Sequence, residues 1–225
     1  MDWNEVLTFF RGPLLRFSLL VFIAGMVYRL VRVTLLGWPR DRVKSRGSKL
    51  AGVVKTYAKG LLVLPFIPWV RRTFGRNALT YLAGGLFHLS LFLVVIFAPA
   101  HMLVWKNLLG FGWPTLANPC VDWLAAVGII SLLVLLVNRL THPVLRLITR
   151  WPIRLNWLLV FLPFVSGFVM ARHLWFRYEV IFSLHLASVC LLLLWIPFSR
   201  ISHFLFYFFS RTIHGAQAGK RAVTP

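Results

Sequence analysis

Acidic residues and cysteines are scarce in this sequence. Five of the 225 residues are Asp or Glu, against 25 Lys or Arg, and the net charge is +20. The two cysteines, Cys120 and Cys190, lie in different hydrophobic segments and form no CxxC pair, so the sequence gives no support to an iron–sulfur cluster or a zinc site. It also contains no phosphate-binding loop and no nucleophile–base motif, so the chain is not expected to be an enzyme on its own.

Hydrophobic residues, in contrast, make up 59% of the sequence, and the mean hydropathy is +0.78. Soluble domains contain about 45–50% apolar residues. The apolar runs here are about 20 residues long, enough for a helix to cross ~30 Å of hydrocarbon. The sequence therefore predicts an all-α integral membrane protein with five transmembrane helices, at residues 13–36, 79–105, 121–140, 155–171 and 179–199. Because the first run is long enough to span and is not followed by a small-residue cleavage site, no cleavable signal peptide is expected.

The predicted domain organisation is simple. Residues 1–210 are expected to form one five-helix membrane domain, and residues 211–225 a flexible cytoplasmic tail. Residues 38–78 are a basic loop. Within this loop, residues 61–70 are apolar but too short to span, so we expect them to lie at the membrane interface.

The distribution of basic residues predicts the orientation in the membrane. The connection from Arg40 to Arg76 contains ten Lys or Arg, and the connection between the third and fourth spans contains Arg139, Arg146, Arg150 and Arg154. Cytoplasmic loops carry an excess of Lys and Arg, so the N-terminus is predicted outside and the C-terminus in the cytoplasm. Such residues bind anionic lipid head groups or an acidic partner, and no nucleic acid is expected.

Four histidines form a pattern. His88 and His101 belong to the second span, and His185 and His203 to the fifth span or its cytoplasmic extension. Since these spans run antiparallel, His88 and His203 are predicted near the cytoplasmic face, and the other two near the outer face. An imidazole inside a membrane is costly unless it has a partner. Two imidazoles from facing helices suit a b-type haem, which needs no CxxCH motif, so the pattern predicts two haem b groups.

The helical spacing of these histidines differs between the two spans. Eighteen residues separate His185 from His203, which is five whole turns, whereas the thirteen between His88 and His101 leave them about 220° apart. We expect Pro99 to bend the helix end and re-aim His101, and Pro197 to act similarly in the fifth span.

Three stretches carry a family resemblance. HLASVCLLLLWIPFSRISH, residues 185–203, resembles the last span of the respiratory nitrate reductase gamma subunit, in which two histidines flank a similar Pro-Phe-Ser-Arg stretch. FHLSLFLVVIFAPAH, residues 87–101, and the N-terminal GPLLRFSLLVFIAGMVYR resemble the branch attached to heterodisulfide-reductase-like iron–sulfur proteins in sulfur- and sulfate-metabolising complexes. The thirteen-residue spacing is longer than in the nitrate reductase subunit and favours that branch. The resemblance covers most of the five-span chain, but not residues 40–60 or the tail.

The resemblance implies a dihaem cytochrome b subunit of a respiratory complex in a prokaryotic cytoplasmic (inner) membrane. It would exchange electrons between the menaquinone pool and a cytoplasmic iron–sulfur subunit, either heterodisulfide-reductase-like or ferredoxin-like. Additional membrane or periplasmic cytochrome c subunits are further candidate partners. By this likeness His88 and His203 hold the cytoplasmic haem, and His101 and His185 the outer one.

Other polar residues near the span ends are candidates for secondary roles. Arg200 on the inner side could neutralise haem propionates, and the outer candidates for propionate or quinone contacts are Lys106, Arg172, His173 and Arg177. His173 is also a candidate to replace His101 or His185 as an outer ligand. All of these residues equally suit lipid anchoring.

Two other functional interpretations use the same residues. A haem-free transporter or proton channel could relay protons through intramembrane histidines. It lacks acidic groups within the spans, because Asp122 and Glu179 lie only at outer ends. A membrane anchor without any cofactor does not predict histidines at matched depths.

Overall fold

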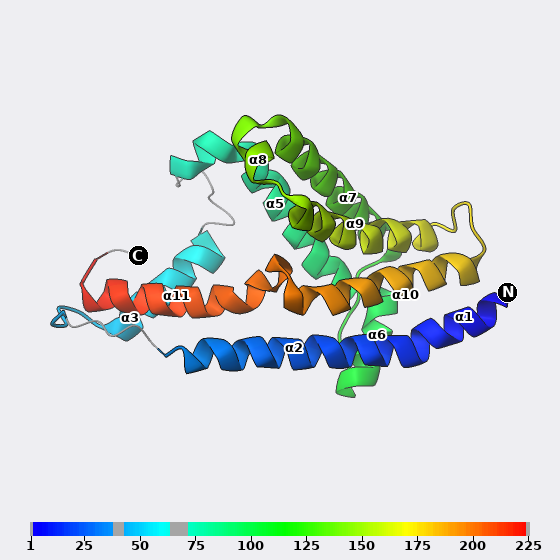
Figure 1. The fold of residues 1–225 in the computed structure, drawn as a ribbon, viewed down its shortest axis with the longest axis horizontal. Coiled ribbons are helices and arrows are strands. Elements are labelled where there is room, and N and C mark those ends of the chain that lie inside the picture. Colours follow the sequence, from blue (N-terminus) through cyan, green and yellow to red (C-terminus); the bar gives the residue numbers. More distant parts are fainter. Residues whose placement is uncertain (1, 38–42, 64–71, 224–225) are drawn as a thin grey trace. The chain divides into compact units, whose positions relative to one another are not determined.

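The computed structural model describes residues 2–37, 43–63 and 72–223 (Figure 1). Helices account for 85% of the structure, and these ranges contain no strand. Five helices are long and apolar enough to cross a membrane: Trp3–Leu35, Asn77–Phe97, Asn118–Thr141, Trp151–Ala171 and Tyr178–Phe198. The prediction of an all-α protein with five such helices is confirmed.

The first of these helices begins earlier than predicted. It consists of α1 (Trp3–Phe9), the π-helical turn η1 (Phe10–Leu14) and α2 (Leu15–Leu35). Asp2 caps the start, its side chain accepting a hydrogen bond of 2.9 Å from the backbone N–H of Asn4. The π-helical turn contains Pro13, which has no N–H to offer the regular ladder. A cap and helix-compatible polar residues thus extend the helix beyond the apolar run that the prediction used.

The second predicted span, 79–105, is interrupted rather than continuous. Helix α5 (Arg72–Phe97) is kinked at Asn77, and α6 (Pro99–Leu109) begins after an extended residue, Ala98, with ψ 136°. A residue that precedes proline is excluded from the α-helical conformation, and proline is favoured in the first turn of a new helix. The expected effect of Pro99 on the helix end is therefore confirmed, and His101 lies on a separate helix from His88.

The third and fourth spanning helices pack against each other. They are α7 (Asn118–Thr141) and α9 (Trp151–Ala171), joined through the short helix α8 (Pro143–Ile148). Their apolar core contains Phe87, Leu132 and Phe164. The Trp157 indole donates a hydrogen bond of 2.8 Å to the Leu132 carbonyl, which satisfies a polar group within the apolar interior.

The last spanning segment is interrupted as well. Helix α10 (Tyr178–Trp195) is followed by two 3-10 turns, η4 (Ile196–Phe198) and η5 (Arg200–Ser202), and by α11 (His203–Lys220). Ser199 between the turns is extended, with ψ 175°. The five whole turns counted between His185 and His203 assume one continuous helix, and that assumption fails, because the helix is broken between them at Pro197 and the extended Ser199.

The chain forms two compact units. The first comprises residues 1–19 and 78–193, and the second residues 20–77 and 194–225, in each case as far as they are described. In the second unit, helix α3 (Lys49–Tyr57) and the π-helical turn η2 (Ala58–Val63) follow the basic loop, and α3 packs on α11. Of the predicted interfacial segment 61–70, residues 64–70 lie outside the described residues.

The close packing of α3 on α11 differs from the prediction that the C-terminal segment is a flexible tail. Gly52 faces the backbone of Gly215 and Gly219 so closely that a Cβ would overlap it, and the Tyr57 hydroxyl donates to the Phe208 carbonyl at 2.9 Å. Residues 211–220 are therefore helical and packed, not a flexible tail. Their small side chains, interpreted as a sign of mobility, instead allow two helix backbones to approach closely.

Candidate functional site: a pair of stacked imidazoles

The structure brings His101 and His185 together within the first unit. His101 lies in the first turn of α6, and His185 lies on α10, where it is 9% exposed. Their ring centres are 6.5 Å apart, and the ring planes differ by 19°. Two histidines that lie 84 positions apart in the sequence thus form one local site.

The helix break positions His101. The carbonyl of Val94, in the last turn of α5, accepts the backbone N–H of Ala98 at 3.1 Å and lies 2.9 Å from His101 Nδ1. A carbonyl oxygen has two lone pairs and cannot donate, so Nδ1 of His101 carries the proton. Pro99 begins α6 in a direction that allows the ring to reach back to α5, which a continuous helix does not permit over seven residues.

His185 is held by α9. Its Nδ1 lies 3.1 Å from the Ser166 hydroxyl oxygen, which itself donates to the Leu162 carbonyl at 2.7 Å. A Cβ added to Gly167 would lie 3.0 Å from His185 Cε1, so the imidazole lies directly against the α9 backbone. Ser166 and Gly167 were not identified from the sequence. A Ser-Gly pair inside an apolar helix is a weak signal, and nothing in the spacing indicates that it faces His185.

The four candidate ligands share one feature. His88 Nδ1 lies 2.7 Å from the Gly84 carbonyl, and His203 Nδ1 lies 3.1 Å from the Arg200 carbonyl. With His101 and His185, all four histidines of the sequence pattern therefore have Nδ1 bonded to an oxygen. For the three rings bonded to carbonyl oxygens, which cannot donate, this arrangement places the proton on Nδ1, the tautomer that is usual when Nε2 is a metal ligand. Among the described residues, the remaining histidines, His142, His173 and His214, form no such bond.

The separation of the paired rings fits an iron between them. If both imidazoles bonded a metal between them at about 2 Å, with roughly 1.1 Å from each nitrogen to its ring centre, the two ring centres would lie about 6 Å apart. The observed 6.5 Å is close to this value. Within the described ranges, no group of three or more His, Cys, Asp or Glu side chains is placed to hold a metal. A haem iron needs only two protein ligands, because the porphyrin supplies the rest.

The two inner candidates lie in different units. His88, on α5 in the first unit, contacts the Phe87 ring, with centres 4.9 Å apart, and the Phe92 ring, with centres 6.4 Å apart. His203 is the first residue of α11 in the second unit, directly after the turn that contains Arg200. Each has its own Nδ1 bond within its own unit.

The outer polar residues form ion pairs with the nearby carboxylates. Arg172 lies 3.1 Å from Asp122, and Arg177 lies 3.7 Å from Glu179. His173 is exposed, with φ 51°, in the turn between α9 and α10, and its ring centre lies 6.2 Å from that of Tyr178. These contacts engage the two arginines with acidic residues. Lys106, which the sequence predicts on the same side, lies in the last turn of α6 and has no described ion pair.

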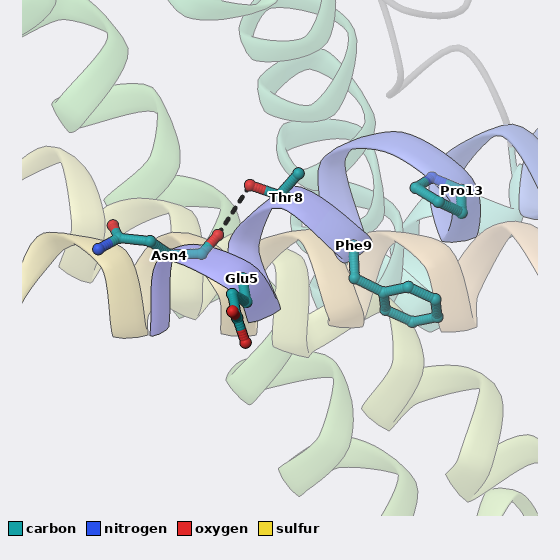
Figure 2. A pocket seen from close by; sticks show the side chains of 5 residues that line it. All are labelled: Asn4, Glu5, Thr8, Phe9 and Pro13. Carbon is teal, nitrogen blue, oxygen red and sulfur yellow. Dashed lines mark hydrogen bonds between the residues drawn. The ribbon is translucent and has the colours of Figure 1, made fainter. Parts of the chain in front are cut away.

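Two shallow grooves lie elsewhere on the first unit. One of about 460 Å³ runs along α1 and η1, where Figure 2 shows the Thr8 hydroxyl bonded to the Asn4 carbonyl; it is lined by Asn4, Glu5, Thr8, Phe9 and Pro13. The other, of about 300 Å³, is lined by residues of α5 and α7, including Leu79, Val137 and Asn138. No histidine lines either groove.

Comparison with known proteins adds one relative. A protein of Nitratidesulfovibrio vulgaris (strain Hildenborough) is 29% identical over 210 residues, which cover 90% of this chain and 89% of that protein. Its name, "Protein", states no activity. No protein-family description and no solved structure matches the chain.

Proposed function

We propose that the chain is a dihaem cytochrome b, similar to the respiratory nitrate reductase gamma subunit and closest to the branch linked to heterodisulfide-reductase-like iron–sulfur proteins. It would transfer electrons between menaquinone and a cytoplasmic iron–sulfur partner. The observation that carries the proposal is the set of four histidines with Nδ1 bonded, two of which also face each other with ring centres 6.5 Å apart. Neither a proton channel nor an anchor requires that separation.

The residues divide between two sites. His101 and His185 would hold the outer haem, and His88 and His203 the cytoplasmic one. Bound haem supplies one-electron redox chemistry. With two imidazoles as its protein ligands, such an iron would have no open position, which would favour electron transfer over oxygen binding. The chain's own contribution is to fix the imidazole tautomers and to keep His185 away from water in the apolar interior.

Orientation and partner follow from the basic residues. The described ranges 43–63 and 203–223 contain eight Lys or Arg and no Asp or Glu; the basic residues are Lys44, Arg46, Lys49, Lys55, Lys59, Arg211, Lys220 and Arg221. With the N-terminus outside, this surface lies in the cytoplasm. A basic surface of this kind fits an acidic face on the iron–sulfur subunit, since opposite charges speed encounter and select the partner.

The quinone would bind on the outer side, near the haem held by His101 and His185. Lys106 is the outer cation best placed to donate to a quinone carbonyl or a propionate, because Arg172 and Arg177 already form ion pairs with Asp122 and Glu179. His173 is a weaker candidate, because its ring contacts Tyr178 in an exposed turn.

The first test is a dithionite-reduced minus oxidised spectrum of the purified protein, with haem extracted and quantified per chain. Two b-type haems per chain are expected from four histidine ligands. One haem would mean that one ligand pair is wrong. A folded protein without haem would contradict the cytochrome and favour the proton channel, which uses the same histidines.

A further inference from the structure

The hydroxyl of Ser166 differs from the Nδ1 partners of the other three histidines, because it belongs to a side chain. His88, His101 and His203 bond through Nδ1 to backbone carbonyls of nearby residues, at most seven positions away in the sequence. His185 has a backbone contact as well, with Pro163, but it also bonds to a side chain on another helix, Ser166 of α9. The Ser166 hydroxyl is therefore the described partner of these rings that a single substitution can remove without changing the backbone.

Counting protons shows the direction of this bond. Ser166 has one hydroxyl proton, and the Leu162 carbonyl accepts it at 2.7 Å. With its proton on that carbonyl, the hydroxyl oxygen is available to His185 as an acceptor, and His185 Nδ1 donates across the 3.1 Å contact. Ser188, one turn further along α10, donates its own hydroxyl to the His185 carbonyl at 2.7 Å and has no second proton for the ring.

Gly167, next to Ser166 on α9, also helps to position His185. A Cβ at this position would lie 3.0 Å from Cε1 and 3.3 Å from Nδ1 of His185. The absence of a side chain therefore lets the imidazole lie against α9 at a distance that brings Nδ1 within reach of Ser166. The ring is 9% exposed, so water does not readily replace this bond.

We propose that Ser166 is a positioning residue for the outer haem, which, together with Gly167, holds His185 in the Nδ1–H tautomer and aims Nε2 at the iron. This inference rests on the proposed function. An acceptor at Nδ1 raises the basicity of the coordinating nitrogen and holds the ring in place, and loss of such a partner typically costs about 10–100-fold in metal affinity. A more basic imidazole stabilises the ferric state and so lowers the reduction potential of the outer haem.

The test compares three variants of the full chain. Ser166→Ala removes the acceptor, and Ser166→Thr keeps a hydroxyl. Ser183→Ala is the matched control, because Ser183 is 1% exposed and its hydroxyl donates to the Glu179 carbonyl at 2.7 Å, but it forms no described bond to an imidazole. Haem loss to excess apomyoglobin and a redox titration of both haems are measured for each.

For Ser166→Ala we expect one of the two haems to be lost about 10–100-fold more readily. The potential of that haem should rise, while that of the other stays constant. Ser166→Thr and Ser183→Ala should behave as the wild type. Unchanged haem loss and potentials in Ser166→Ala would overturn the proposal. So would equal disturbance of both haems, or an effect of Ser183→Ala of the same size, since either result indicates a general structural role.

A second measurement separates this inference from the cytochrome proposal. The ¹⁵N spectrum of the histidine side chains reports which ring nitrogen carries the proton. If the wild-type chain contains no haem, the proposed function fails, but the spectrum still tests the bond. His185 should be the Nδ1–H tautomer in the wild type and a mixture in Ser166→Ala, and an Nε2–H tautomer in the wild type would contradict the assignment.

Discussion

Replacing His101 by alanine removes one of two imidazoles that lie 6.5 Å apart. The other ring stays in place, because Ser166 and Gly167 hold it from α9, which His101 does not touch in any described contact. If the proposed function holds, the outer haem would then lack one of its two protein ligands, while His88 and His203 are unchanged. The haem content is expected to fall from two to one per chain.

The structure supplies controls for this experiment. His142→Ala and His214→Ala change histidines that form no described Nδ1 hydrogen bond, and both variants should retain two haems. His101→Met keeps a ligand and should retain the haem with a higher potential, since methionine as an axial ligand raises the potential. The assay is pyridine haemochrome quantification with a redox titration. Two haems with unchanged potentials in His101→Ala would refute the ligand assignment.

Three other predictions concern packing and charge. Gly128→Ala should destabilise the first unit by about 1–3 kcal/mol in thermal unfolding, because a Cβ would overlap the Phe164 ring and lie 2.7 Å from the Ser90 hydroxyl. The control is Gly85→Ala, whose Cβ meets open space and which should not destabilise the unit. Gly215→Val should speed tryptic cleavage within residues 43–63, because its Cβ would lie 2.7 Å from Val53 Cα and separate α3 from α11; unchanged cleavage would contradict the close packing. If the proposed acidic iron–sulfur partner binds the basic residues of the second unit, charge reversal of Lys49 and Lys55 to Glu should weaken that binding and flatten its salt dependence in titrations at low and high salt. Lys106→Glu, in the first unit and predicted on the outer side, should leave binding unchanged.

The interruptions of the spanning helices show which helix breaks local sequence rules predict and which they miss. Pro99 correctly indicated a bend, because proline restricts the residue before it wherever it occurs. Pro197 also indicated a bend, but the extended Ser199 and the second 3-10 turn were not predicted. A periodicity calculated for an unbroken helix therefore does not apply to His185 and His203.

The C-terminal segment is the reverse case, because order was present where the sequence suggested a flexible tail. Its small and polar residues, Gly215 and Gly219 among them, resemble a mobile tail when no neighbour is known. Their role appears only with α3 alongside, because a glycine allows a close helix contact only if another helix is there to make it.

The sequence by itself determined the membrane-spanning helices, since hydrophobic length and charge distribution act locally along the chain. It also indicated which histidines to consider, because an imidazole within an apolar run is conspicuous. Only the tertiary structure decided that His101 and His185 lie together, with ring centres 6.5 Å apart, and that Ser166 lies within hydrogen-bond distance of His185. Those contacts join α6, α9 and α10, and packing between helices depends on side-chain shapes that no single segment of sequence contains.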